Sequence, residues 1–147
     1  MTTFARPTAL VICLGALASA VPAMAQSVAD FYKGKSIFLV VGSGPAGGYD
    51  VYTRALARYW SRHIPGNPNL VVQNMPGAGG ITMMNYIAHI AKPDGTYIGA
   101  AFANTVIEPV FDKGKVTKYD SRQMKWIGSI SPQSIGCFTW GTTRSGR

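Results

Sequence analysis

The sequence predicts an α/β fold with a mostly parallel sheet flanked by helices. The first observation is a short, β-branched apolar run at Ser36–Val41, which is typical of a buried strand. The second is that a glycine-rich loop follows this run and leads directly into a helical pattern. The third is that the same order of strand, glycine loop and helix returns from residue 69. Strands that alternate with helices pair in parallel through right-handed crossovers, so we expect one parallel sheet.

The first unit continues from its glycine loop, residues 42–48, into a helix from Val51. Asp50 stands where an N-cap residue belongs. Arginines recur every four residues and predict a solvated basic face or, alternatively, a patch for an anion or a partner. These are Arg54, Arg58 and Arg62. The other side of the helix is apolar and predicts a buried face, formed by Val51, Tyr52, Ala55, Leu56, Tyr59, Trp60, His63 and Ile64.

The second unit consists of a strand at residues 69–73, a glycine loop at residues 74–80 and a helix from about residue 81 to residue 91. Further strands are expected at residues 97–101, 126–130 and 134–139, whereas the pattern between residues 102 and 118 predicts no single element. The helix has an apolar stripe that favours core packing over a cofactor site, made of Met83, Met84, Ile87 and Ala91.

Composition limits the class of protein. The chain has 147 residues and 47% hydrophobic residues, which suits one domain or one lobe and argues against disorder. Two cysteines cannot build a disulfide scaffold, and no Cys/His cluster has the spacing of a zinc site. The formal net charge is +8, which favours anionic partners.

The N-terminus has the pattern of an export signal. Arg6 precedes an apolar stretch at residues 9–21, and small residues at positions 23 and 25 predict cleavage after Ala25. An uncleaved membrane anchor is the alternative, because no charge occurs between Thr8 and Ala25. Export implies a periplasmic protein of net charge +7, in which Cys137 is expected to be buried, and it disfavours nucleic acid as a partner.

Each glycine loop lies between the carboxyl end of a strand and the beginning of a helix, which suits it to binding an anion. The first amides of a helix lack intrahelical partners, the helix dipole is positive there, and glycine allows close approach to the backbone. Loops that follow neighbouring parallel strands open on the same sheet edge, so both are expected to face one crevice. The alternative is that these glycines serve only tight turns.

An exported enzyme with a cofactor site in the first loop is a second possibility. Gly42, Gly44 and Gly47 match the spacing of a dinucleotide-binding loop. The acidic residue that should follow about twenty positions later is missing, however, since no Asp or Glu occurs between Val51 and Ile90. His63 and His89 are isolated, and neither a phosphate-binding Gly-Lys-Ser/Thr nor a Gly-x-Ser-x-Gly elbow is present. We therefore expect a binding protein without catalytic residues, metal or cofactor, in which Asp50 either caps the helix or contacts a donor group of the ligand.

Five segments carry a resemblance to a known family. They are Phe-Tyr-Lys-Gly-Lys-Ser-Ile at residues 31–37, Pro-Ala-Gly-Gly-Tyr-Asp at 45–50, Asn-Met-Pro-Gly-Ala-Gly-Gly at 74–80, Lys-Pro-Asp-Gly-Thr-Tyr at 92–97 and Trp-Ile-Gly-Ser at 126–129. With the signal peptide, they resemble the solute-binding receptors of tripartite tricarboxylate transporters, the Bug family of periplasmic proteins. The resemblance covers nearly all of residues 26–140.

This resemblance implies a type II periplasmic-binding-protein-like fold of two lobes that closes on a small carboxylate, without a cofactor. Residues 1–25 would be the signal peptide and residues 26–140 the first lobe. Because family members are much longer, the second lobe is expected to be missing, and the polar tail at residues 141–147 is expected to result from a truncation or frameshift. The partners implied are the membrane subunits of the transporter, with the receptor a monomer.

The resemblance also implies which residues hold the ligand. Backbone donors of the two loops would bind one carboxylate end, and a third contact would follow the strand at residues 97–101. The implied ligand-binding residues are Ser43, Ala46, Gly47, Asp50, Gly77, Ala78, Gly79, Phe102 and Thr105. Several positions depart from the family pattern, so the identity of the carboxylate stays open: Ser43, Tyr49, Met75 and Glu108. A non-functional fragment of such a receptor is the remaining alternative.

Overall fold

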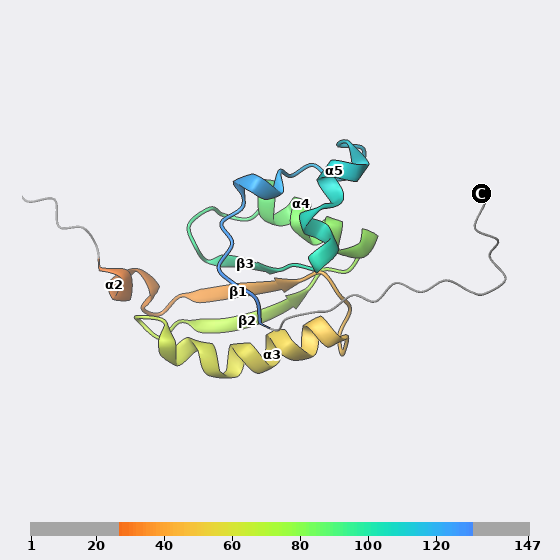
Figure 1. Cartoon of the computed structure of the whole chain (residues 1–147). Helices are drawn as coiled ribbons and strands as arrows, with labels where there is room; N and C mark the ends of the chain where they lie inside the picture. The colour runs from red at the N-terminus through yellow and green to blue at the C-terminus, as the bar shows by residue number, and fades with distance from the viewer. Residues whose placement is uncertain (1–26, 131–147) are drawn as a thin grey trace, which may run out of the picture.

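The computed structural model describes residues 27–130 (Figure 1). Three strands and four α-helices follow one another in this part of the chain: α2 (Val28–Tyr32), β1 (Ser36–Val41), α3 (Gly48–Trp60), β2 (Asn69–Asn74), α4 (Ile81–His89), β3 (Tyr97–Ala100) and α5 (Glu108–Asp112). The expected signal peptide, the expected strand at residues 134–139, Cys137 and the polar tail lie outside the described residues. Between residues 27 and 130, no helix is both long and apolar enough to cross a membrane.

The strands form one parallel sheet in the order β2-β1-β3. Ser36 lies opposite Asn69 at the start of the β1–β2 pair, and Val41 lies opposite Asn74 at its end. On the other side, Val41 lies opposite Ala100 of β3. The carboxyl ends of all three strands therefore meet at one edge, and the predicted parallel α/β arrangement is confirmed.

The core lies between the sheet and α4. Met83 and Met84 of α4 are buried and pack with Val40 of β1, which confirms the predicted inward stripe of this helix. Gly99 of β3 permits the close approach, because a β-carbon there would lie 3.0 Å from the sulfur of Met83. Tyr119 closes this core from the segment that follows α5.

The orientation of α3 differs from the prediction. The helix begins at Gly48 with Gly47 as its N-cap, so Asp50 lies in the first turn and the predicted N-cap role is wrong. The buried residues of α3 are Asp50 and Thr53, whereas Tyr52 and Tyr59 of the expected buried face are exposed. The helix is turned this way because Asp50 is held by groups of β2 and of the first loop.

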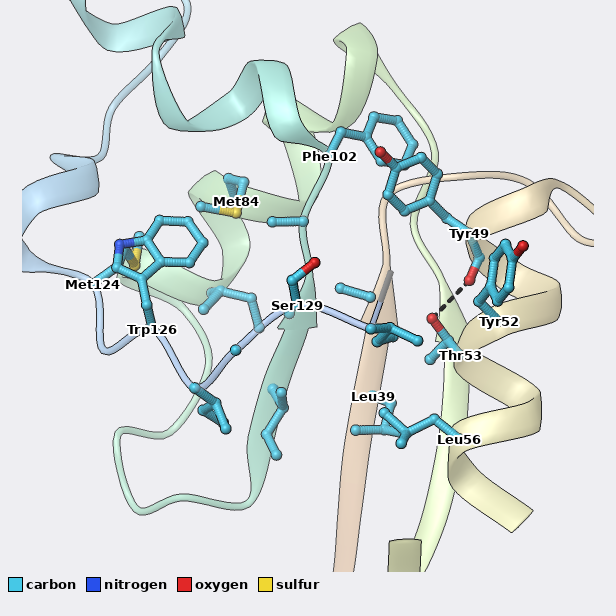
Figure 2. A pocket seen from close by; sticks show the side chains of 18 of the residues that line it. Leu39, Tyr49, Tyr52, Thr53, Leu56, Met84, Phe102, Met124, Trp126 and Ser129 are labelled. Atoms are coloured by element: carbon cyan, nitrogen blue, oxygen red, sulfur yellow. Dashed lines mark hydrogen bonds between the residues drawn. The ribbon is translucent and has the colours of Figure 1, made fainter. Parts of the chain in front are cut away.

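Residues 126–130 do not form the predicted strand. Trp126 and Ile127 are exposed, and the segment pairs with neither edge of the sheet. The indole nitrogen of Trp126 instead donates a hydrogen bond to the carbonyl oxygen of Ser121, at 3.0 Å. The segment passes across the face of the sheet that α3 leaves open, so its apolar residues face a hollow and form no ladder (Figure 2).

Candidate functional site

The two glycine loops meet at the carboxyl edge of the sheet. The first loop, residues 42–47, follows β1, and the second loop, residues 75–80, follows β2. A β-carbon on Gly42 would lie 3.0 Å from the Cα atom of Gly80, so the two backbones are in close contact. The amide of Met75 donates to the carbonyl oxygen of Val41 at 2.8 Å and extends this junction. The structure thus places the beginnings of both following helices at one sheet edge, as parallel pairing predicts.

A buried carboxylate connects the first loop to the end of β2. Asp50 accepts hydrogen bonds from Nε of Arg54 at 2.9 Å, from Nδ2 of Asn74 at 2.7 Å and from the amide of Ala46 at 2.9 Å. Asn74 also donates to the carbonyl oxygen of Ser43 at 3.1 Å and accepts from Nη2 of Arg54 at 2.9 Å. One network therefore fixes the first loop, the first turn of α3 and the end of β2.

The same network sets the charge of Asp50. Hydrogen bonds from Arg54 and then from Asn74 outweigh the effect of burial and lower the pKa of Asp50 to about 2. The carboxylate is therefore ionised at neutral pH, and Arg54 is its counter-charge. Arg54, Arg58 and Arg62 are all exposed, as predicted for a solvated basic face, and Arg54 in addition donates to Asp50 and Asn74.

The second loop has an unusual backbone conformation. Gly77, Ala78, Gly79 and Gly80 all have positive φ angles, of 140°, 46°, 62° and 92°. Glycine is required at position 77, where a β-carbon would lie 2.6 Å from Oγ1 of Thr82. Residues 77–79 are exposed, so the backbone of this loop is presented at the surface.

Two backbone amides of the first loop already have hydrogen-bond acceptors within the protein. The amide of Ala46 is committed to Asp50, and the amide of Gly47 lies 3.4 Å from the carbonyl oxygen of Gly44. The hydroxyl oxygen of Ser43 is buried and has no hydrogen-bond partner among the described residues. It lies 3.3 Å from the position of a β-carbon on Gly47, beneath the start of α3. Asp50 and Ala46 thus shape the loop, and Ser43 keeps an unused hydrogen-bonding group inside it.

The two residues expected after β3 have different environments. Thr105 is fully buried, and its hydroxyl donates to the carbonyl oxygen of Phe102 at 2.7 Å, so this hydroxyl is used within its own turn, while Cγ2 packs against Gly80 of the second loop. Phe102 is half-buried and packs against Gly80, 3.0 Å from the position of a β-carbon there. Its ring centroid lies 4.3 Å from that of Tyr49, which places an aromatic pair beside the loop junction (Figure 2).

Asn104 lies in the segment after β3, around residues 102–105, where the third contact was expected, but it is not among the implied ligand-binding residues. Its side-chain nitrogen lies 3.4 Å from the carbonyl oxygen of Gly79, so the segment after β3 contacts the second loop directly. The available signal was an amide side chain shortly after the end of a strand, at the edge where the two loops were already expected.

A large apolar hollow adjoins the aromatic pair. It has a volume of about 1120 Å³ and lies between α3, the open face of the sheet and residues 124–130 (Figure 2). Tyr52, Leu56 and Trp60 of α3 line it, together with Leu39 of β1. The apolar side of α3 that was predicted to be buried therefore lines this hollow.

Comparison with known proteins finds no matching family model, no similar curated protein and no similar solved structure. Among residues 27–130, no group of three or more His, Cys, Asp or Glu side chains could hold a metal ion. His89 lies 2.6 Å from the carbonyl oxygen of Lys118, at the far end of α4 from the loops. The candidate site is thus defined by the junction of the two glycine loops.

Proposed function

We propose that this chain is the first lobe of a periplasmic solute-binding receptor of the tripartite tricarboxylate transporter type, which captures a small carboxylate for delivery to membrane subunits. The finer fold assignment, a type II periplasmic-binding-protein-like lobe, is part of this proposal. The single observation that carries it is the contact between the two glycine loops, which brings two helix beginnings to one sheet edge.

The electrostatics of this edge favour a negatively charged group. The first amides of α3 lack intrahelical partners, and the dipole of this 13-residue helix adds to their partial positive charge at the edge where the second loop also lies. The negative charge of Asp50 is compensated by Arg54 at 2.9 Å, so it does not cancel this attraction. Since no other Lys or Arg occurs between residues 36 and 57, recognition would rest on the backbone.

Binding is favoured over catalysis by the state of the one carboxylate at the site. With a pKa of about 2, Asp50 is a poor proton acceptor or donor near neutral pH. Its four hydrogen-bonding contacts to Arg54, Asn74 and Ala46 also occupy its oxygen atoms. Asp50 therefore suits a role in holding the loops more than a role in acid–base chemistry.

Titration calorimetry of the chain against citrate, succinate and benzoate, with the matching neutral amides as blanks, tests the proposal. The informative variant is Gly79→Asp, which adds a carboxylate at the exposed second loop in a backbone of φ 62°. Its matched control is Gly34→Asp, at a position of φ 73° with open space around it and at the opposite end of β1.

We expect carboxylate binding that Gly79→Asp abolishes and Gly34→Asp preserves. Equal affinity for a carboxylate and its neutral amide would contradict the proposal. Binding of a nucleotide cofactor without any carboxylate would favour the exported enzyme, and a folded chain that binds no carboxylate would favour the non-functional fragment.

A further inference from the structure

The short helix α5 has an apolar side that faces outward. Ile107, Val110 and Phe111 follow one another at helical spacing and are 54%, 72% and 73% exposed. The acidic residues of the same segment, Glu108 and Asp112, are half-buried. This is the reverse of the usual arrangement of a surface helix, and α5 stands out from the body of the molecule (Figure 1).

Hydrogen bonds on the inner side hold α5 in this orientation. One carboxylate oxygen of Asp112 accepts from the amide of Val116 at 2.7 Å, and from the amide and hydroxyl of Thr117 at 2.6 Å and 2.7 Å. Glu108 is half-buried, and its charge acts on Tyr119, whose pKa is raised first by burial and then by Glu108. A rotation of α5 about its axis that buried its apolar side would break these hydrogen bonds. The hydrogen bonds of Asp112 therefore keep that side exposed.

Basic residues adjoin the apolar side. Lys113 ends the helix in a left-handed conformation, with φ 51°, and Lys115 follows in the loop that Asp112 folds back; both are exposed. Val116, in the same loop, is 51% exposed. We call this surface the α5 tip, and it consists of Ile107, Val110, Phe111, Lys113, Lys115 and Val116.

The size and charge of the α5 tip indicate which kind of partner it can bind. A stable protein–protein interface needs roughly 800 Å² from each partner, about twenty residues or more, whereas the α5 tip is one projecting turn and its loop. A second copy of a chain of net charge +8 would be repelled. Exposed apolar side chains flanked by lysines suit the boundary between the headgroups and acyl chains of an anionic bilayer.

We propose that the α5 tip is an interfacial site, which inserts its apolar side chains into an anionic membrane surface while its lysines contact the lipid headgroups. This inference is independent of the carboxylate site, because it depends on neither glycine loop. It predicts a weak, reversible and salt-sensitive attachment.

Co-sedimentation with vesicles of equimolar phosphatidylglycerol and phosphatidylcholine, compared with pure phosphatidylcholine, tests this site. The intact chain is used throughout, so that residues 1–26 contribute equally to every variant. Phe111→Ser removes the most exposed apolar side chain, and Lys113→Glu with Lys115→Glu reverses the local charge. The matched controls on α3 and the turn after it are Tyr59→Ser, at a tyrosine that is 59% exposed, and Arg58→Glu with Arg62→Glu.

We expect tighter binding to the anionic vesicles. Phe111→Ser should weaken it by roughly tenfold, and the double lysine variant by about 25-fold or more, since each lysine near an anionic surface contributes roughly fivefold. The α3 controls should bind like the parent, and circular dichroism should show all variants folded. The absence of a preference for anionic vesicles, or equal losses in tip and control variants, would overturn the proposal. A concentration-dependent dimer that Phe111→Ser abolishes would overturn it in favour of self-association.

Discussion

Asn74 donates a hydrogen bond of 2.7 Å to the carboxylate of Asp50, which lies 24 residues earlier in the chain. The same amide nitrogen contacts the carbonyl oxygen of Ser43 at 3.1 Å. Asn74 ends β2 and Asp50 lies in the first turn of α3, so this bond connects the end of one strand to the helix that follows its neighbour. This bond therefore helps to hold the first loop and the start of α3 against the end of β2.

Replacing Asn74 by Ala should therefore destabilise the loop junction. The change removes the donor to Asp50 and to Ser43 and leaves Nη2 of Arg54 without this acceptor, so we expect a loss of about 1–3 kcal/mol in the free energy of unfolding. Urea denaturation followed by circular dichroism measures it. Gln73→Ala, at the preceding exposed position of β2, is the control. Equal losses in the two variants would contradict the role assigned to Asn74.

The low pKa of Asp50 predicts an acid-sensitive contribution to stability. Its folded pKa of about 2 lies below the ordinary aspartate value of about 3.9, so the stabilisation is fully present above about pH 4 and is lost as the pH falls toward 2. Asp50→Asn should be less stable than the parent at neutral pH, and the difference should shrink across this window. Unfolding free energies measured from pH 7 to pH 2 test this. A difference that does not change with pH would show that Asp50 is not held as a carboxylate.

Gly80→Ala should show how tightly the second loop packs against the segment after β3. A β-carbon there would lie 3.0 Å from the ring of Phe102 and 3.2 Å from Cγ2 of Thr105, in a backbone of φ 92°. We expect a loss of about 2–4 kcal/mol in unfolding free energy, since steric overlap adds to backbone strain. Gly34→Ala has similar strain, with φ 73°, but open space, and should cost about 1–2 kcal/mol. Chemical denaturation of both variants measures the two losses of unfolding free energy. Equal losses would exclude a contribution from steric overlap at Gly80.

Tyr119→Phe should weaken the turn that carries Phe102. The Tyr119 hydroxyl donates to the carbonyl oxygen of the fully buried Thr105 at 2.6 Å, and its removal leaves that carbonyl without this partner. We expect a loss of about 1–2 kcal/mol in the free energy of unfolding. Tyr59→Phe, at an exposed tyrosine of α3, should have almost no effect in the same denaturation experiment. A stable Tyr119→Phe variant would mean that another group satisfies the Thr105 carbonyl.

The strands and α4 could be predicted because their signals are local. The run at Ser36–Val41 is a strand with the bounds expected, and β2 extends one residue beyond its predicted end. Met83 and Met84 are buried as their helical spacing indicates. The glycine loops were predictable for the same reason, since a run of glycines between a strand and a helix restricts what the backbone can do there.

The buried side of α3 and the path of residues 126–130 could not be predicted, because both depend on residues that are distant in the sequence. Periodicity placed an apolar face of α3 in the core, but the side chains that pack inward are Asp50 and Thr53. Asp50 is drawn inward by Asn74, a residue of the next strand. Residues 126–130 have the composition of a strand, but they cross the open face of the sheet without pairing to it.

By itself, the sequence determined the repeated strand–loop–helix unit and the common edge at which the two loops open. Hydrophobic period and glycine content act over a few neighbouring residues, and parallel pairing then fixes where the loops lie. Only the tertiary structure decided which side of α3 is buried, that the Thr105 hydroxyl is used within its own turn, and that the apolar side of α5 faces outward. These features follow from hydrogen bonds between groups far apart in the chain or packed side by side in space, which no local pattern specifies.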